Sequence, residues 1–134
     1  MLNEEDKKAI LTRIKSVPIS GKLEMEILKL DDGYCEARVP HDTSYDGIFN
    51  CFHGGMLMTV ADTIACWAVL TKSGADINTA TTDMSIRFLA ACTSEVTARA
   101  RVIKFGRTMC PVAVDLYDSR EKHVAVAQVN YILL

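Results

Sequence analysis

The sequence predicts an α+β fold in which one curved antiparallel sheet of about six strands wraps around a single long central helix. Between Met56 and Thr71 the chain has one charged residue, Asp62, and this stretch is apolar on nearly every face of a helix. Segments on both sides of it alternate apolar and polar residues, which is typical of half-buried strands. The 134 residues, 49% of them hydrophobic, suit a single domain, 1–134.

A helix that is apolar all round needs cover on most of its sides. One curved sheet covers most of such a helix, and a second copy of the chain can extend the sheet and close what remains. The pattern therefore predicts a homodimer.

A short surface helix is expected over residues 4–16. Asn3 can cap its first turn, where Glu4, Glu5 and Asp6 complement the helix dipole. Pro18 is expected to end it.

A hairpin is expected next. Leu23 to Ile27 alternates apolar and acidic residues, Asp31 to Gly33 forms a turn, and Tyr34 to Val39 is the partner strand. Residues 40–52 are polar and loop-like, and the central helix follows from about Gly55 to Ser73. Further strands are expected over residues 79–89, 95–103, 110–116 and 123–133.

Charge and hydropathy exclude several classes of partner. The formal net charge is -2 and no Lys/Arg cluster occurs, so we expect no nucleic acid and no anionic membrane surface. The first ten residues are charged and lack the apolar core of a signal peptide. The apolar helix is judged too short to span a membrane, and it carries Asp62.

The cysteines and histidines indicate neither a disulfide framework nor a metal site. Cysteine occurs five times, an odd number, with no CxxC spacing, so we expect free thiols in a reducing cytoplasm. The three histidines are far apart in sequence, and we expect no metal.

Asp62 is the first candidate for chemistry, because a carboxylate in an apolar helix loses hydration and contributes little stability. The alternative is an Asp that reaches water at a subunit interface or caps a neighbouring backbone. Before the helix, Gly54 and Gly55 expose the unpaired amides of its first turn, where negative charge is favoured. These glycines could also serve only a tight entry into the helix.

The spacing of these residues argues for a site shared by two subunits. Asp62 follows Gly54 by eight residues, which is roughly 12 Å along one helix. That distance is too long for both groups to act on one carbonyl, whereas a two-fold dimer can bring Gly54 of one subunit to Asp62 of the other.

Several longer motifs carry a resemblance. They are FHGGMLMTVAD at the helix entry, then TTDMSIRFLAA, KFGRT, VAVDLYD and AVAQVNYIL in the strands. From about residue 21 to 134 the chain resembles the hotdog-fold acyl-CoA thioesterases, specifically the phenylacetate-degradation-type branch.

The resemblance implies hydrolysis of a coenzyme A thioester to free acid and coenzyme A, in a site between two subunits and without a separate cofactor. It implies a dimer, with a tetramer built as a dimer of dimers. Asp62 would be base or nucleophile, the Gly54 amide would polarise the carbonyl, and Thr81 would position water. His53 would shape the turn and help hold the thioester; it could act as a catalytic general acid or serve only as a capping or packing residue. Substrate-binding residues would be Gly55, Phe88, Lys104, Gly106, Arg107 and Thr108.

One departure from the family pattern leaves alternatives open. The family commonly has Asn six residues before the His of HGG, where this chain has Gly47; Asn50 lies where the family often has Gly. Asn50 could reach the same space from another backbone position, which makes it a further catalytic candidate. Alternatively, the chain only binds acyl-CoA or another small ligand. A hotdog hydratase is disfavoured, because Asp42, Asp46 and Asp62 are not followed by a His five residues later.

The acyl group is not predicted, because the depth of its pocket depends on how residues such as Met56, Met58, Trp67 and Phe88 pack.

Overall fold

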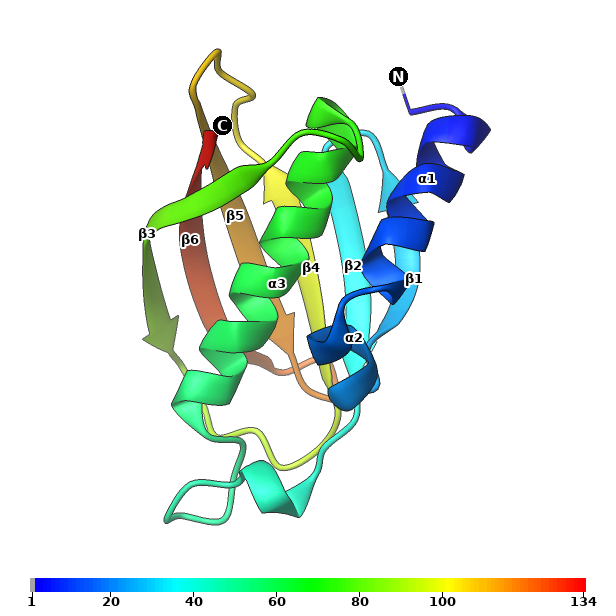
Figure 1. Ribbon diagram of the computed structural model, residues 1–134. Coiled ribbons are helices and arrows are strands. Elements are labelled where there is room, and N and C mark those ends of the chain that lie inside the picture. Colours follow the sequence, from blue (N-terminus) through cyan, green and yellow to red (C-terminus); the bar gives the residue numbers. More distant parts are fainter. Residues whose placement is uncertain (1) are drawn as a thin grey trace.

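The structure, a computed structural model, describes residues 2–134 and confirms the predicted α+β class (Figure 1). One long helix lies across one sheet, and two short helices flank it. In chain order the elements are α1 (Glu4–Lys15), α2 (Pro18–Lys22), β1 (Glu26–Asp31), β2 (Tyr34–Val39), η1 (Thr43–Tyr45), α3 (Gly54–Ser73), β3 (Thr79–Phe88), β4 (Val96–Val102), β5 (Met109–Tyr117) and β6 (His123–Leu133).

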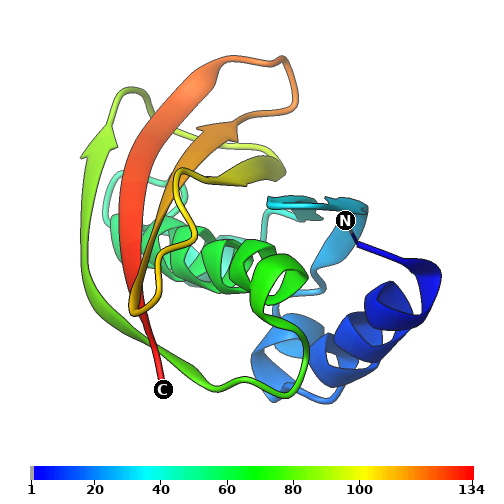
Figure 2. The same ribbon diagram turned by 90° about the horizontal axis from the view of Figure 1, so that it is seen from above.

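The six strands form one antiparallel sheet in the order β1-β2-β4-β5-β6-β3. Seen from above, the sheet curls around α3 and leaves one side of the helix uncovered (Figure 2). β3 is an edge strand, so one row of its backbone groups has no partner strand within the subunit. A second subunit could therefore cover the open side of α3 and pair with the free edge of β3 at the same time.

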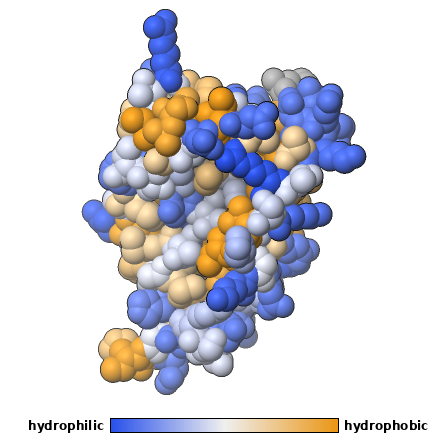
Figure 3. All heavy atoms as spheres, in the orientation of Figure 1, coloured by the Kyte–Doolittle hydropathy of each residue, from blue (hydrophilic) through white to orange (hydrophobic). Residues whose placement is uncertain are grey.

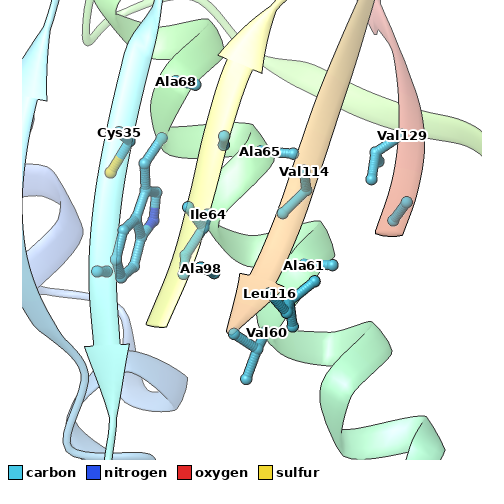
Figure 4. Packing of buried hydrophobic residues seen from close by; sticks show 14 of the residues in the cluster. Cys35, Val60, Ala61, Ile64, Ala65, Ala68, Ala98, Val114, Leu116 and Val129 are labelled. Carbon is cyan, nitrogen blue, oxygen red and sulfur yellow. The ribbon is translucent and has the colours of Figure 1, made fainter. Parts of the chain in front are cut away.

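Small side chains allow α3 to lie close to the sheet. Ala61, Ala65 and Ala68 on the helix are fully buried, as is Ala98 on β4 (Figure 4). Larger residues, such as Leu116 on β5, fill the space between these close approaches. The core is therefore a packed helix–sheet interface.

The N-terminal region follows the prediction in part. Asn3 caps α1 by accepting a hydrogen bond from the Asp6 N–H at 2.8 Å. Pro18 does not only end this region, as predicted: it starts the short helix α2, because proline tolerates a first helical position. The strand expected from Leu23 is also corrected, since Leu23 caps α2 and β1 begins at Glu26.

Arg13 fastens α1 to the connection between α3 and β3. Its guanidinium donates hydrogen bonds to the backbone carbonyl oxygens of Ala75 and Ile77 and to the Asn78 Oδ1, the last at 3.0 Å. A planar guanidinium can serve several acceptors at once. This contact holds α1 against the C-terminal half of α3.

The length of α3 corrects one sequence argument. The helix has 20 residues and is long and apolar enough to cross a membrane by length and composition alone. However, 56% of its most apolar 18-residue stretch is buried inside the fold. The prediction that the helix is too short to span a membrane was therefore wrong. Packing against the sheet accounts for its apolar composition.

Replacing Ala98 with Leu should lower the free energy of unfolding by about 1–3 kcal/mol, because the added atoms would push α3 away from the sheet. Ala113→Leu is the matched control: Ala113 lies on β5 with a half-buried side chain on the opposite sheet face. Urea unfolding measures both. Equal losses in the two variants would contradict the close approach at Ala98.

Candidate active site

The start of α3 leaves one backbone amide free. His53 is the N-cap residue, and its Nδ1 accepts a hydrogen bond from the Gly55 N–H at 2.9 Å. The N–H groups of Met56 and Leu57 both donate to the His53 carbonyl oxygen, at 2.9 and 3.1 Å. Within residues 2–134, the Gly54 N–H donates to no acceptor. Gly54 therefore presents the unpaired donor of the first helical turn.

This pattern separates the roles of the two glycines. Because the Gly55 amide is occupied by His53, it is not available to a ligand unless the cap opens. The imidazole of His53 is exposed and works here as a helix cap.

The Phe88 ring packs over Gly54. A Cβ atom at Gly54 would lie 3.1 Å from the Phe88 Cζ, closer than side chains normally approach. These two residues, with Leu57 and Cys92 among others, line a cavity of about 340 Å³. The absence of a side chain at Gly54 keeps the amide accessible beside this aromatic wall.

Asp62 lies two turns further along α3 and is only half-buried, whereas the sequence predicted burial. Its Oδ1 accepts hydrogen bonds from the Thr81 hydroxyl on β3 and the Tyr131 hydroxyl on β6, both at 2.7 Å. Tyr131 also donates to the Asp62 carbonyl oxygen. In the described chain no donor is bonded to Oδ2. Two donors thus orient the carboxylate and leave one oxygen available to a reactant.

A β-bulge in β3 aims Thr81 at this carboxylate. Thr81 is opposite Tyr131 on β6, while Asp83 is opposite Asn130, so Thr82 is the extra residue of the bulge. The bulge keeps Thr81 on the helix side of the sheet and places Asp83 on the outer side, where Asn130 donates to it. β3 therefore supplies a polar group to each face within three residues.

Tyr131 is a site residue that the sequence analysis missed. It is 3% exposed, and burial, followed by its hydrogen bond to Asp62, raises its pKa well above the usual value. The phenol therefore stays protonated and keeps donating to the carboxylate. An inward-facing Tyr in the alternation of residues 125–131 was the available signal, because a buried tyrosine hydroxyl usually needs a partner.

The structure does not bring all predicted residues together within one subunit. Asp62 and Thr81 meet, but the Gly54 amide is at the start of α3, roughly 12 Å away along the helix. Asn50 is exposed in a left-handed conformation, with φ 57°, in the turn before the helix. No side-chain hydrogen bond joins Asn50 to the other site residues of the described chain.

The predicted coenzyme A residues lie elsewhere. Lys104, Arg107 and Thr108 are exposed in the loop between β4 and β5, which Figure 1 shows near the C-terminal end of α3. Close backbone packing requires glycine at position 106, because a Cβ there would lie 2.6 Å from the Met109 carbonyl oxygen. Residues 2–134 contain no cluster of three His, Cys, Asp or Glu that could hold a metal.

Comparison with known families identifies the group to which this architecture belongs. The family model described as "Thioesterase superfamily" matches residues 49–125, more than half of the chain. The chain belongs to the thioesterase superfamily. The matched region starts before the His53 cap and includes Gly54, Asp62 and Thr81. No curated protein matches the sequence of this thioesterase-superfamily chain.

Solved structures share the fold over nearly the whole chain. The E. coli PaaI protein from the phenylacetic acid degradation operon has a TM-score of 0.91 at 18% identity, covering 100% of this chain and 96% of that one. A thioesterase family protein from Silicibacter pomeroyi has a TM-score of 0.89 at 20% identity, covering 96% and 98%. A Haemophilus influenzae thioesterase has a TM-score of 0.84 at 25% identity, covering 92% and 87%.

Removing the Tyr131 hydroxyl should change how stability depends on pH. An unfolded tyrosine ionises near pH 10.0, but the folded pKa is higher, so unfolding releases a proton above pH 10 and stability falls as pH rises. Tyr131→Phe should remove up to about 1.4 kcal/mol per pH unit from this slope.

Urea unfolding between pH 8 and 11 measures the effect. A residual slope should remain, since burial also raises the pKa of Cys35 to about 12. An unchanged slope in Tyr131→Phe would show that this phenol is not shielded as described.

Proposed function

We propose that this thioesterase-superfamily chain hydrolyses acyl-CoA thioesters in a site built across a two-fold dimer. Asp62 of one subunit would act with the Gly54 amide of its partner. The observation that carries the proposal is the Asp62 carboxylate, oriented by Thr81 and Tyr131 on the uncovered side of α3 with Oδ2 free. Such fixed geometry is what a base or nucleophile requires.

The chemistry needs a donor where negative charge develops. As water attacks the thioester carbon, the carbonyl oxygen gains charge, and the free amide at the positive end of α3 can stabilise it. Acting as base, Asp62 Oδ2 takes the proton of the water. The C–S bond then breaks, and the proton passes to the departing thiolate, giving the acid and coenzyme A.

Acting as nucleophile, Asp62 Oδ2 would instead attack the same carbon, release coenzyme A and form an anhydride. Water would then hydrolyse the anhydride and restore the carboxylate. Thr81 and Tyr131 hold the carboxylate in either route, so both remain part of the proposal.

The two-fold symmetry also gives the loop between β4 and β5 a role. That loop is at the opposite end of α3 from Gly54. In a dimer with antiparallel α3 helices, the loop of one subunit would lie on the same side as Gly54 of its partner. The cations of Lys104 and Arg107 and the hydroxyl of Thr108 would then contact the phosphates of coenzyme A. Gly55 and Phe88 would line the path of the thioester.

The finer assignments follow from the same features. The HGG entry with Asp62 nine residues after His53 supports the phenylacetate-degradation-type branch. The uncovered side of α3 supports a dimer, and the family resemblance implies that two such dimers form a tetramer. The five cysteines are free thiols, which supports a cytoplasmic location.

A second candidate function is acyl-CoA binding without hydrolysis. It is favoured by the turn before α3, where Gly47 has no amide side chain and Asn50 is exposed and left-handed. Tight binding of acyl-CoA with no release of thiol above background would support this candidate.

Asp62→Asn should lower kcat by at least about 100-fold, because the amide cannot accept the proton or attack the carbonyl. Thiol release from short, medium, long and aromatic acyl-CoAs measures the loss. Asp83→Asn is the matched control, since that carboxylate lies on the outer face of β3, the strand that carries Thr81, and its replacement should leave kcat within about twofold. Hydrolysis by Asp62→Asn at the wild-type rate would refute the proposed role.

Gly54→Ala should lower kcat/KM by about 10- to 100-fold, because the new methyl group both pushes Phe88 and obstructs approach to the amide. A double-mutant cycle with Phe88→Ala separates these effects. If access to the amide matters, Phe88→Ala should not restore activity to Gly54→Ala. Recovery in the double variant would mean that Gly54 serves only the packing of Phe88.

Gly21→Ala is the control for these glycine variants. A Cβ at this exposed position in α2 would meet no atom within 4 Å. Its activity should therefore remain at the wild-type level.

A further inference from the structure

Two large apolar side chains project from the turn before α3. Ile48 is 88% exposed and Phe49 is 84% exposed. Figure 3 shows an isolated hydrophobic cluster projecting at the lower end of the molecule, where this turn lies in Figure 1. Exposed apolar side chains of this size commonly mark an interaction site when they stand together.

The turn that carries them is well defined. The Gly47 N–H donates to the Cys51 carbonyl oxygen at 2.9 Å, and the Asn50 N–H donates to the Gly47 carbonyl oxygen at 3.1 Å. Asp46 pairs with Phe52 through a β-bridge, and its Oδ1 lies 2.6 Å from the His41 Nε2. The apolar pair is therefore presented from a closed turn that is anchored at its base.

An apolar pocket of about 410 Å³ lies toward the other end of α3. Its apolar lining includes Cys66, Trp67 and Leu70 of α3, Ile14 of α1, and Ile77 in the connection that Arg13 holds. The polar residues Arg13, Asn78 and Thr79 also line it. Cys66 is one helical turn after Asp62, so the pocket begins next to the proposed reactive carboxylate. Ile77 at its rim is 40% exposed.

One subunit cannot bring its own turn to its own pocket. The turn precedes Gly54, and Trp67 is thirteen residues later on the same straight helix, about 20 Å away. In a two-fold dimer, the free edges of the two β3 strands could pair antiparallel. Each end of β3 would then lie beside the opposite end of the partner's β3. The turn lies beside the Phe88 end of β3, because Cys51 and Phe88 line the same cavity. In such a dimer it reaches the Thr79 end of the partner, where Ile77 and the pocket lie.

We propose that the Ile48–Phe49 turn of each subunit closes the Trp67 pocket of its partner. The occupant of the pocket mouth is thus a second copy of this chain. The turn is apolar and exposed, and the pocket is mainly apolar with an exposed rim at Ile77; both border the uncovered side of α3. The proposal rests on the proposed function for one further step: the closed chamber takes the apolar tail of the acyl group, and Phe49 packs against the far end of a long tail.

Chemical cross-linking tests the contact without reference to activity. Phe49→Cys/Ile77→Cys should give a covalent dimer with a short bis-maleimide, seen on a denaturing gel. Each single variant controls for the native cysteines, and Phe49→Cys/Leu28→Cys is the matched control because Leu28 lies on β1, the opposite edge strand. No covalent dimer from the test pair, or an equal yield from the control pair, would overturn the contact.

The acyl-chain profile tests the chamber. Phe49→Ala should lower kcat/KM at least about tenfold for decanoyl-CoA and leave acetyl-CoA within about twofold, since only the longer chain reaches the pocket mouth. An equal change for both substrates would overturn the contact between Phe49 and the far end of a long acyl tail. If the test pair cross-links but no acyl-CoA is hydrolysed by the wild type, the proposed function fails and the contact stands.

Discussion

The hydrogen bonds from Thr81 and Tyr131 to Asp62 are the interaction on which the rest of the site depends. They join the central helix to two neighbouring strands at the edge of the sheet. A carboxylate beside an apolar core needs such partners, because loss of hydration without compensation is costly. The bulge at Thr82 and the burial of Tyr131 are therefore part of the means by which this fold holds a charge in place.

The two sides of α3 explain why the site is incomplete in one subunit. Alanines on one side allow close contact with the sheet, while Thr59, Asp62 and Cys66 remain half-covered on the other. The capped start of the same helix leaves the Gly54 amide unpaired two turns away from Asp62. Donor and carboxylate are both prepared, but the rigid length of the helix keeps them apart.

Several residues predicted for the site also have a structural role in the fold. His53 occupies one amide as a helix cap, and Gly106 is required by close backbone packing, so each has a structural explanation beside its predicted role. Asn50 adopts the left-handed conformation that favours Gly or Asn, which gives a local reason for Asn at that position. Tyr131 was missed because a tyrosine in an alternating strand resembles any other core residue until its partner is known.

The sequence by itself determined the α+β class, the central helix and most strands, because these follow from local periodicity and from the turn residue Gly33. It also singled out Asp62 and the two glycines, since one charge in an apolar helix is visible without coordinates. Only the tertiary structure decided the strand order, the start of β1, the partners of Asp62 and the one amide left free. Those features depend on contacts between residues far apart in the chain, which local spacing does not encode.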